Sequence, residues 1–320
     1  MKKSTRFVVL TACGLILAGL LLCGVAIARG ADILQMMKNG DFSLHSGDLN
    51  LGQGISVANG QYGGNDSYTV CTGGEAQFSA AKVERLDIGW IAGDVEISVY
   101  DGDEIKVTES ASRPLEENEK LRWKLEDGVL RLRYCAPGVC NMQEKSLVVL
   151  IPESLCLEEL EVDVISAELT LDALTVRGEV NFDSVSGGVR ARMLSCERLS
   201  VSTVSGQGEI SGSMERLRYS STSGGMQADG LSEGCEVETD TVSGNMELRF
   251  EGCPGNIEAD STSGSVRIYL PDDVGFALDY DSVSGDLDCD FPYLKGVYGG
   301  EVRFEMDIST TSGDLDIHKN

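Results

Sequence analysis

The sequence predicts an all-β protein whose second half is a β-solenoid. A tetrapeptide of the form Ser/Thr-Val/Thr-Ser-Gly recurs seven times, its first six copies lie 18 to 21 residues apart, and the alternation of apolar residues changes phase at each copy. A fixed period near 20 residues is typical of solenoids, in which each repeat forms one coil stacked on the next. We therefore expect about seven to eight coils. The recurring glycines are Gly187, Gly206, Gly224, Gly244, Gly264, Gly285 and Gly313.

Residues 1–30 are predicted to form an N-terminal transmembrane anchor. The basic residues Lys2, Lys3 and Arg6 precede an uncharged run over Phe7–Ala28. At about 1.5 Å per residue this run can cross the hydrocarbon core of a bilayer, roughly 30 Å thick. Basic residues before the run orient the N-terminus towards the cytoplasm. We therefore expect a single-pass protein of the cell membrane, with the bulk of the chain extracytoplasmic.

Two alternatives to a retained anchor remain open. Ala26-Ile27-Ala28 matches the small-residue cleavage site of a signal peptide, and Leu10-Thr11-Ala12-Cys13 resembles a lipoprotein cleavage box. The uncharged run is longer than the usual apolar core of a signal peptide, which favours the anchor over both alternatives.

Two regions are expected between the anchor and the repeats. Residues 31–80 are rich in Gly, Ser, Asn and Gln and are predicted to be a flexible tether. Residues 81–155 show β alternation without the period, so we interpret them as a β cap that covers the first coil. The expected cap strands are Val83–Ile88, Val95–Val99, Ile105–Thr108, Leu121–Leu125, Val129–Arg133 and Leu147–Ile151.

Residues 156–320 are predicted to hold the stacked coils. In one coil Val237, Thr239 and Thr241 share a face, and after the Ser-Gly the opposite parity, Met246 and Leu248, takes over. A change of face at a fixed place indicates a corner, and glycine supplies backbone angles that a corner can need. The small hydroxyl residue beside it can bind corner amides or stack from coil to coil.

The repeats resemble a family of bacterial β-strand-repeat domains of unknown function, labelled adhesin and also called the toastrack domain. The closest matches are Ser282-Val-Ser-Gly-Asp-Leu-Asp-Cys289 and Thr310-Thr-Ser-Gly-Asp-Leu-Asp-Ile317, and Leu147–Pro152 resembles the strand that precedes the family's repeats. The resemblance covers Val83 to Ile317, although Gly225 replaces the Asp in a middle coil. It implies a β-solenoid tethered to the bacterial envelope, sometimes within stress-response systems, and implies no catalytic residues.

Charge limits the partners. Beyond residue 30 the chain holds 22 Lys and Arg against 52 Asp and Glu, a formal charge of −30. This balance argues against nucleic acid and against an anionic lipid surface as partners. It is compatible with divalent cations and basic partners, and also with a merely solvated acidic surface.

The sequence contains few candidates for chemistry. Its two histidines, His45 and His318, lie outside any nucleophile motif, and no phosphate-binding or zinc motif occurs, so we expect no enzyme and no cofactor. The Pro-Gly turn between Cys135 and Cys140 makes this pair the best disulfide candidate. Four acidic residues near the C-terminus are candidate ligands for Ca²⁺ if the last two coils stack in register, the alternative being a solvated acidic edge. They are Asp286, Asp288, Asp314 and Asp316.

The favoured function is a membrane-anchored, extracytoplasmic, adhesin-like scaffold that binds without catalysis. A stacked β-coil offers long flat faces but no built-in catalytic cleft, which suits a cell-wall polymer or an envelope protein as partner. The alternative is a component of a cell-envelope stress-sensing system that docks a membrane regulator.

Overall fold

The computed structural model describes residues 68–136 and 143–320. The predicted anchor, most of the predicted tether and Cys140 lie outside these ranges. Within them, no helix is long and apolar enough to cross a membrane.

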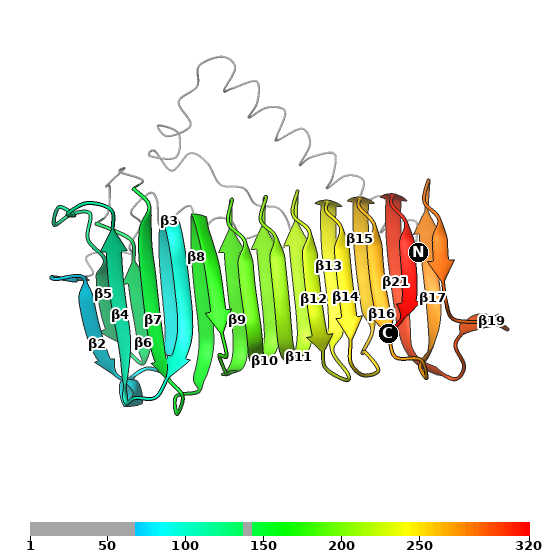
Figure 1. Cartoon of the computed structure of the whole chain (residues 1–320), viewed down its shortest axis with the longest axis horizontal. Helices are drawn as coiled ribbons and strands as arrows, with labels where there is room; N and C mark the ends of the chain where they lie inside the picture. The colour runs from blue at the N-terminus through cyan, green and yellow to red at the C-terminus, as the bar shows by residue number, and fades with distance from the viewer. Residues whose placement is uncertain (1–67, 137–142) are drawn as a thin grey trace, which may run out of the picture.

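The described chain is almost entirely β and forms one long stack of strands (Figure 1). The elements are β1 (Thr69–Val70), β2 (Glu75–Ser79), the 3-10 helix η1 (Ala80–Lys82), β3 (Arg85–Tyr100), β4 (Glu104–Ala111), β5 (Arg122–Glu126), β6 (Val129–Arg133), β7 (Lys145–Pro152), β8 (Leu157–Asp172), β9 (Val176–Ser184), β10 (Val189–Thr203), β11 (Gly208–Ser221), β12 (Met226–Leu231), β13 (Glu236–Ser243), β14 (Met246–Phe250), β15 (Ile257–Ser263), β16 (Val266–Leu270), β17 (Gly275–Ser282), β18 (Leu287–Cys289), β19 (Tyr293–Leu294), β20 (Val297–Tyr298), β21 (Val302–Ser312) and β22 (Leu315–Lys319).

Each coil contributes to two walls that pack face to face. The strand before a Ser-Gly corner lies in the pre-corner wall, and the strand after it lies in the post-corner wall. In the coil of Gly244, β13 pairs in parallel with β11 and β15, whereas β14 pairs in parallel with β12 and β16. The long strands β3 and β8 run through a corner and belong to both walls. All coils therefore stack along one axis, as the repeat period predicted.

The predicted change of face at the corner is confirmed. Before the corner Val237, Thr239 and Thr241 are buried, and after it Met246 and Leu248 are buried. The buried residues thus change from odd-numbered positions before the corner to even-numbered positions after it. The change is needed because both walls must direct their apolar side chains into the same core. One continuous hydrophobic core results, which extends from Cys71 to Ile317.

The corner glycines are required by close packing between coils. A Cβ added to Gly244 would lie 2.1 Å from the carbonyl oxygen of Gly224, and the other six corner glycines would place a Cβ 1.7 to 2.1 Å from the backbone oxygen of the adjacent coil. None of the seven has a φ in the left-handed region. The prediction that these corners need backbone angles special to glycine is therefore wrong. Glycine is required because the adjacent coil leaves no room for a side chain.

The expected roles of the small hydroxyl residues are confirmed in four coils. Ser184 Oγ accepts a hydrogen bond from the Gly187 amide at 2.7 Å, and Ser221 Oγ accepts one from the Gly224 amide at 2.7 Å. In the next pair of coils Thr241 Oγ1 donates to Ser261 Oγ at 3.3 Å. These buried hydroxyls satisfy polar groups at the corner that the apolar core cannot.

The last two coils exchange their order in space. The coil of β21 and β22 comes last in the chain, yet β21 lies between β15 and β17, and β22 lies between β16 and β18. The ladder of corners accordingly runs from Gly264 to Gly313 and then to Gly285. The longer spacing before the last repeat holds the hairpin β19–β20, through which the chain leaves the end of the stack and returns.

The N-terminal region contributes more to the solenoid than the sequence predicted. β3 pairs in parallel with β8 along both walls and is itself a coil, with Gly93 at its corner. The antiparallel pairs β4–β7 and β5–β6 then cover its outer side, as expected of a cap. β1 and β2 lie within the range assigned to the tether but join this cap. The period is hidden because the cap strands separate β3 from β8 in sequence.

We expect Gly244→Val to lower the free energy of unfolding by about 1–3 kcal/mol, the usual range for overpacking a close contact. The matched control is Ser243→Val, because Ser243 is the adjacent, exposed residue of the same corner. Urea denaturation of both variants measures the effect. Equal stabilities for the two variants would contradict the packing role of the glycine.

Candidate functional site

A continuous groove follows the Ser-Gly corners on the post-corner side of the solenoid. Three hollows of about 570, 320 and 510 Å³ adjoin one another along this line. The first two share Glu168 and Ser186, and the last two share Gln207 and Glu209. We call this surface the corner groove.

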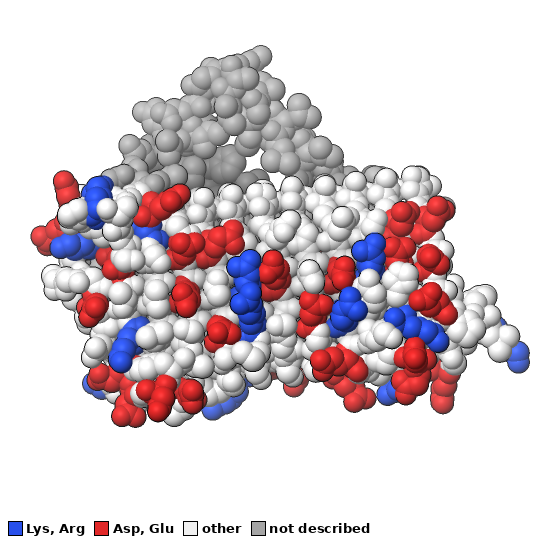
Figure 2. All heavy atoms as spheres, viewed as in Figure 1, with Lys and Arg blue, Asp and Glu red and all other residues white. Residues whose placement is uncertain are grey.

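The groove exists because the corner ladder lacks side chains. A second small residue often follows the corner glycine, as at Gly188 and Gly225, and both glycines line the hollows. On one side the groove is bordered by exposed serines that precede the corners: Ser186, Ser205 and Ser223. Figure 2 shows that the rim over the central coils is free of charged side chains, which begin below it.

The other border of the groove is a row of polar side chains, one from each coil. From the coil of Gly187 onward the residues in register are Arg190, Glu209, Gln227, Glu247 and Arg267. Asp94 and Glu168 lie opposite each other two residues nearer the corner, because Arg190 is in register with Thr170. Arg190 Nε contacts Glu209 at 2.7 Å, and Arg267 lies 3.6 Å from Glu247. The hydrogen bond between Arg190 and Glu209 raises the pKa of the arginine and lowers the pKa of the glutamate. Both partners of each ion pair are partly exposed to solvent. The pairs are therefore weak, and a bound ligand can replace either partner.

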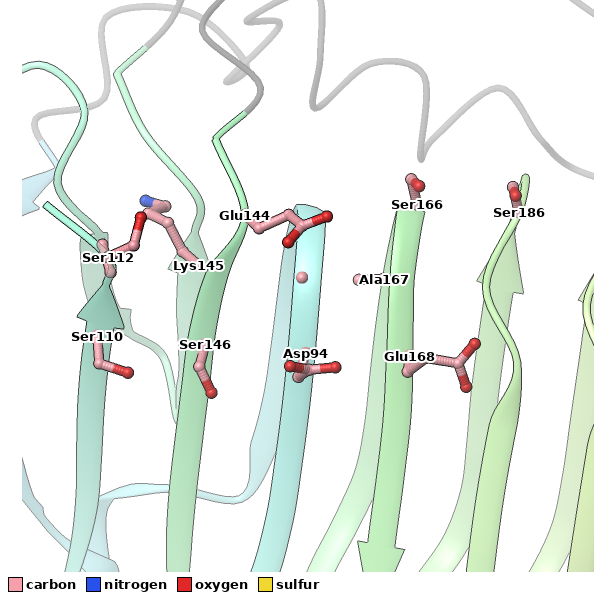
Figure 3. A pocket seen from close by; sticks show the side chains of 12 residues that line it. Asp94, Ser110, Ser112, Glu144, Lys145, Ser146, Ser166, Ala167, Glu168 and Ser186 are labelled. Carbon is pink, nitrogen blue, oxygen red and sulfur yellow. The ribbon is translucent and has the colours of Figure 1, made fainter.

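The N-terminal part of the groove is acidic. Figure 3 shows Asp94 and Glu168 side by side on β3 and β8, with Glu144 above Asp94 and Ser166 at the rim. Glu168 also accepts a 3.4 Å hydrogen bond from the Gly188 amide, which holds its carboxylate beside the corner.

A buried ion pair supports this end of the groove. Lys145 Nζ lies 2.6 Å from Glu109 Oε1, and the two side chains are 1% and 2% exposed. Lys145 also donates to the carbonyl oxygens of Glu119 and Tyr134, and its ammonium lies over the Tyr134 ring at 3.8 Å. Glu109 accepts the Leu121 amide at 3.0 Å. Burial lowers the pKa of Lys145, although the charge of Glu109 opposes this shift.

This ion pair was missed at the level of sequence. Lys145 begins a strand that continues, after Ser146, with the apolar run Leu147–Ile151. Glu109 lies in another β segment 36 residues earlier. Only the antiparallel pairing of β4 with β7 brings the two strands together.

The four predicted calcium ligands do not form a cage. The coils stack as required, with Asp288 opposite Asp316, but Asp314 accepts the Asp286 amide at 3.0 Å and Asp316 pairs with Arg267 at 3.3 Å. In the ranges that the structure describes, no three His, Cys, Asp or Glu side chains are placed to hold a metal ion. We therefore assign Asp314 a role in joining coils.

Asp314 belongs to a series of side chains that bind the amide of the next coil. Asn245 Oδ1 accepts the Ser265 amide at 3.0 Å, Ser265 Oγ accepts the Asp314 amide at 3.3 Å, and Asp314 continues the series to Asp286.

The cysteines in the repeats are core residues. Cys196, Cys235 and Cys253 are buried, and burial raises the pKa of Cys196 and of Cys235 to about 12. Such thiols are poor nucleophiles at neutral pH. Cys135 is also buried, and its predicted disulfide partner Cys140 lies outside the described residues.

The pre-corner wall contains a buried carboxylate that the sequence did not reveal. Asp163 is 6% exposed, and in the described structure its Oδ1 has no hydrogen-bond partner. Burial, together with the nearby charges of Glu161 and Asp183, raises the pKa of Asp163 to about 8. Asp163 alternates with the inward residues Val162 and Val164, so the sequence indicates an ordinary outward position.

The family of this chain is decided by a match over most of its length. The family model described as Toastrack DUF4097 matches residues 83–318. The chain belongs to the Toastrack DUF4097 family. This confirms the resemblance seen in the repeats, and no family of enzymes is indicated. No curated protein matches the chain.

Solved structures resemble this toastrack chain at low identity. A putative adhesin from Bacteroides fragilis is 11% identical, with a TM-score of 0.46, covering 76% of this chain and 95% of its own. A putative cell adhesion protein from Clostridium sporogenes is 14% identical, with a TM-score of 0.25, covering 79% of this chain and 100% of its own. A putative lipid binding protein from Parabacteroides distasonis is 16% identical, with a TM-score of 0.37, covering 76% and 97%. At these scores the likenesses carry no argument about function.

We expect Lys145→Met to destabilise the toastrack domain by about 3–5 kcal/mol, because it leaves Glu109 charged and buried without its partner. The double variant Lys145→Met, Glu109→Gln removes that charge and should recover part of the loss. Guanidinium denaturation of both variants measures this difference. A single variant as stable as the wild type would contradict the role of the pair.

We expect the contribution of Asp163 to the free energy of unfolding to fall as pH rises from about 4 to 8. The folded protein keeps a proton on Asp163, whose pKa is raised to about 8, whereas the unfolded chain loses it near the usual value of 3.8. Between these values the single group contributes a slope of about 1.4 kcal/mol per pH unit.

The variant Asp163→Asn should remove this part of the pH dependence and be the more stable protein at pH 8. Urea denaturation at several pH values measures both effects. Parallel profiles for the variant and the wild type would contradict the shift.

Proposed function

We propose that this chain is a membrane-anchored, extracytoplasmic scaffold that binds an extended cell-wall polymer along the corner groove without catalysis. The observation that carries the proposal is the continuity of the groove, which crosses many coils and has a serine hydroxyl beside each successive corner. Adjacent coils are about 4.8 Å apart, so a polymer with a short repeat meets equivalent groups again and again. Belonging to the Toastrack DUF4097 family is consistent with this proposal.

The chemistry of the groove favours a carbohydrate-type polymer. Its rim offers serine hydroxyls, its floor offers backbone next to glycine, and its border offers the amides of Gln207, Gln227 and Asn245 among charged pairs. Hydroxyls, amides and exposed ion pairs are groups that bind the hydroxyl and amide groups of a polysaccharide by hydrogen bonds. The predicted anchor over residues 7–28 would hold such a scaffold at the outer surface of the membrane.

The test is co-sedimentation of the full-length protein, in detergent micelles, with purified insoluble cell walls. Gln207 lies where two hollows of the groove meet, so Gln207→Trp should fill the groove and weaken binding about fivefold or more. The control Glu258→Trp places the same side chain on the exposed surface of the pre-corner wall and should bind like the wild type.

Unchanged binding by Gln207→Trp, with an unchanged melting temperature, would show that the corner groove is not the site. Binding to envelope proteins but not to purified walls would favour a protein partner instead.

A further inference from the structure

The two ends of the solenoid are finished differently. The N-terminal end is covered by the antiparallel strands of the cap. At the other end, in the described part of the chain, β18 pairs only with β22, and the outer side of β17 pairs only at Phe276, with Tyr298 of β20. β18 therefore presents a row of backbone hydrogen-bonding groups with no neighbouring strand in the described ranges, and we call it the C-terminal edge. Figure 1 shows this end of the stack beside the projecting hairpin that contains β19.

The core is incomplete at this edge. In the neighbouring coil of β22, Leu315 and Ile317 are 0% exposed. Leu287, which occupies the equivalent position in the outermost coil, is 37% exposed. Most of the large exposed apolar side chains of the described ranges gather at this end of the solenoid. They are Val283, Leu287, Tyr293, Leu294 and Val302, with Met193 as the exception.

The edge is nevertheless built as a regular coil. The hydroxyl of Tyr280 donates to the carbonyl oxygens of Gly313 at 3.2 Å and Asp286 at 3.4 Å, so the corner of this coil is tied to its neighbour. Tyr219 makes the equivalent pair of contacts in the middle of the stack, to Gly206 and Gly225. A strand that arrived at the edge would meet a preformed template, and little further ordering would be required.

Charge at the edge specifies the chemistry of the missing neighbour. Along the outward row Glu247 is followed by Arg267, Arg267 by Asp316 and Asp316 by Asp288, which ends the row. Asp286, Asp288 and Asp290 alternate with Leu287 and Cys289 on this strand. A neighbour that alternates apolar and basic residues would cover the apolar positions and neutralise the carboxylates.

We propose that the C-terminal edge binds an extended, basic segment of a partner protein, which adds beside β18 as a further strand. Its apolar side chains cover Leu287 and Cys289, and its basic side chains lie against Asp288 and Asp290. The backbone hydrogen bonds supply affinity, and the alternation supplies selectivity. A second copy of this chain would bring its own carboxylates against the same row, which like-charge repulsion disfavours. This site is separate from the corner groove, so its test is independent of the polymer experiment.

The test is fluorescence anisotropy with the full-length protein in detergent micelles. The probe is a labelled peptide with the sequence Ser-Gly-Lys-Leu-Lys-Ile-Lys, and the two control peptides are the same sequence with N-methylated backbone amides and an acidic form with Glu in place of each Lys. We expect the first peptide to bind and each control to bind roughly tenfold more weakly or not at all, because one control removes the strand hydrogen bonds and the other removes charge complementarity.

Matched protein variants separate the edge from the general negative charge of the protein. Asp288→Lys should weaken the basic peptide roughly tenfold and strengthen the acidic one, whereas Glu104→Lys makes the same charge change on the exposed surface of the cap and should alter neither. Equal binding of the N-methylated peptide, or equal effects of the two variants, would overturn the proposal. So would formation of a dimer that Asp288→Lys strengthens, because a second copy would then be the occupant.

Discussion

The close approach of successive coils at the Ser-Gly corner is the constraint on which the rest of the structure depends. The backbone oxygen of each corner lies where a Cβ on the corner glycine of the adjacent coil would have to be, as for Gly224 and Gly244. Only glycine fits there, so every coil turns at the same point and the two walls stay in register over the whole stack. The same absence of side chains hollows the surface beside the corners and produces the groove.

Regular stacking also explains how an acidic chain can build a continuous surface. Arg190 lies against Glu209, and Arg267 lies against both Glu247 and Asp316, so opposite charges follow one another along the stack. Where carboxylates do succeed each other, as at Asp314 and Asp286, the first accepts the amide of the second and joins the coils. Acidic side chains thus take part in the stacking as well as in contact with solvent.

The two ends of the solenoid differ in how they close the stack of coils. At the N-terminal end the antiparallel cap strands cover the coil of β3, and the buried pair of Lys145 and Glu109 joins β7 to β4. At the other end the chain inserts its final coil next to β15 and leaves the earlier coil of β17 outermost. The edge of that outer coil keeps apolar and acidic residues in alternation and has no neighbouring strand in the described ranges, so this end of the stack stays open.

The sequence by itself determined the solenoid, its period and the place of its corners. Local patterns carried this information, because the alternation of apolar residues and the positions of the glycines can be read from short stretches of sequence. An example is the burial of Thr241 before Gly244 and of Met246 after it. Tertiary structure alone decided the exchanged order of the last coils, the Lys145–Glu109 pair and the environment of Asp163. Each of these depends on which distant strands become neighbours, and in parallel stacking several orders of coils satisfy the same local pattern.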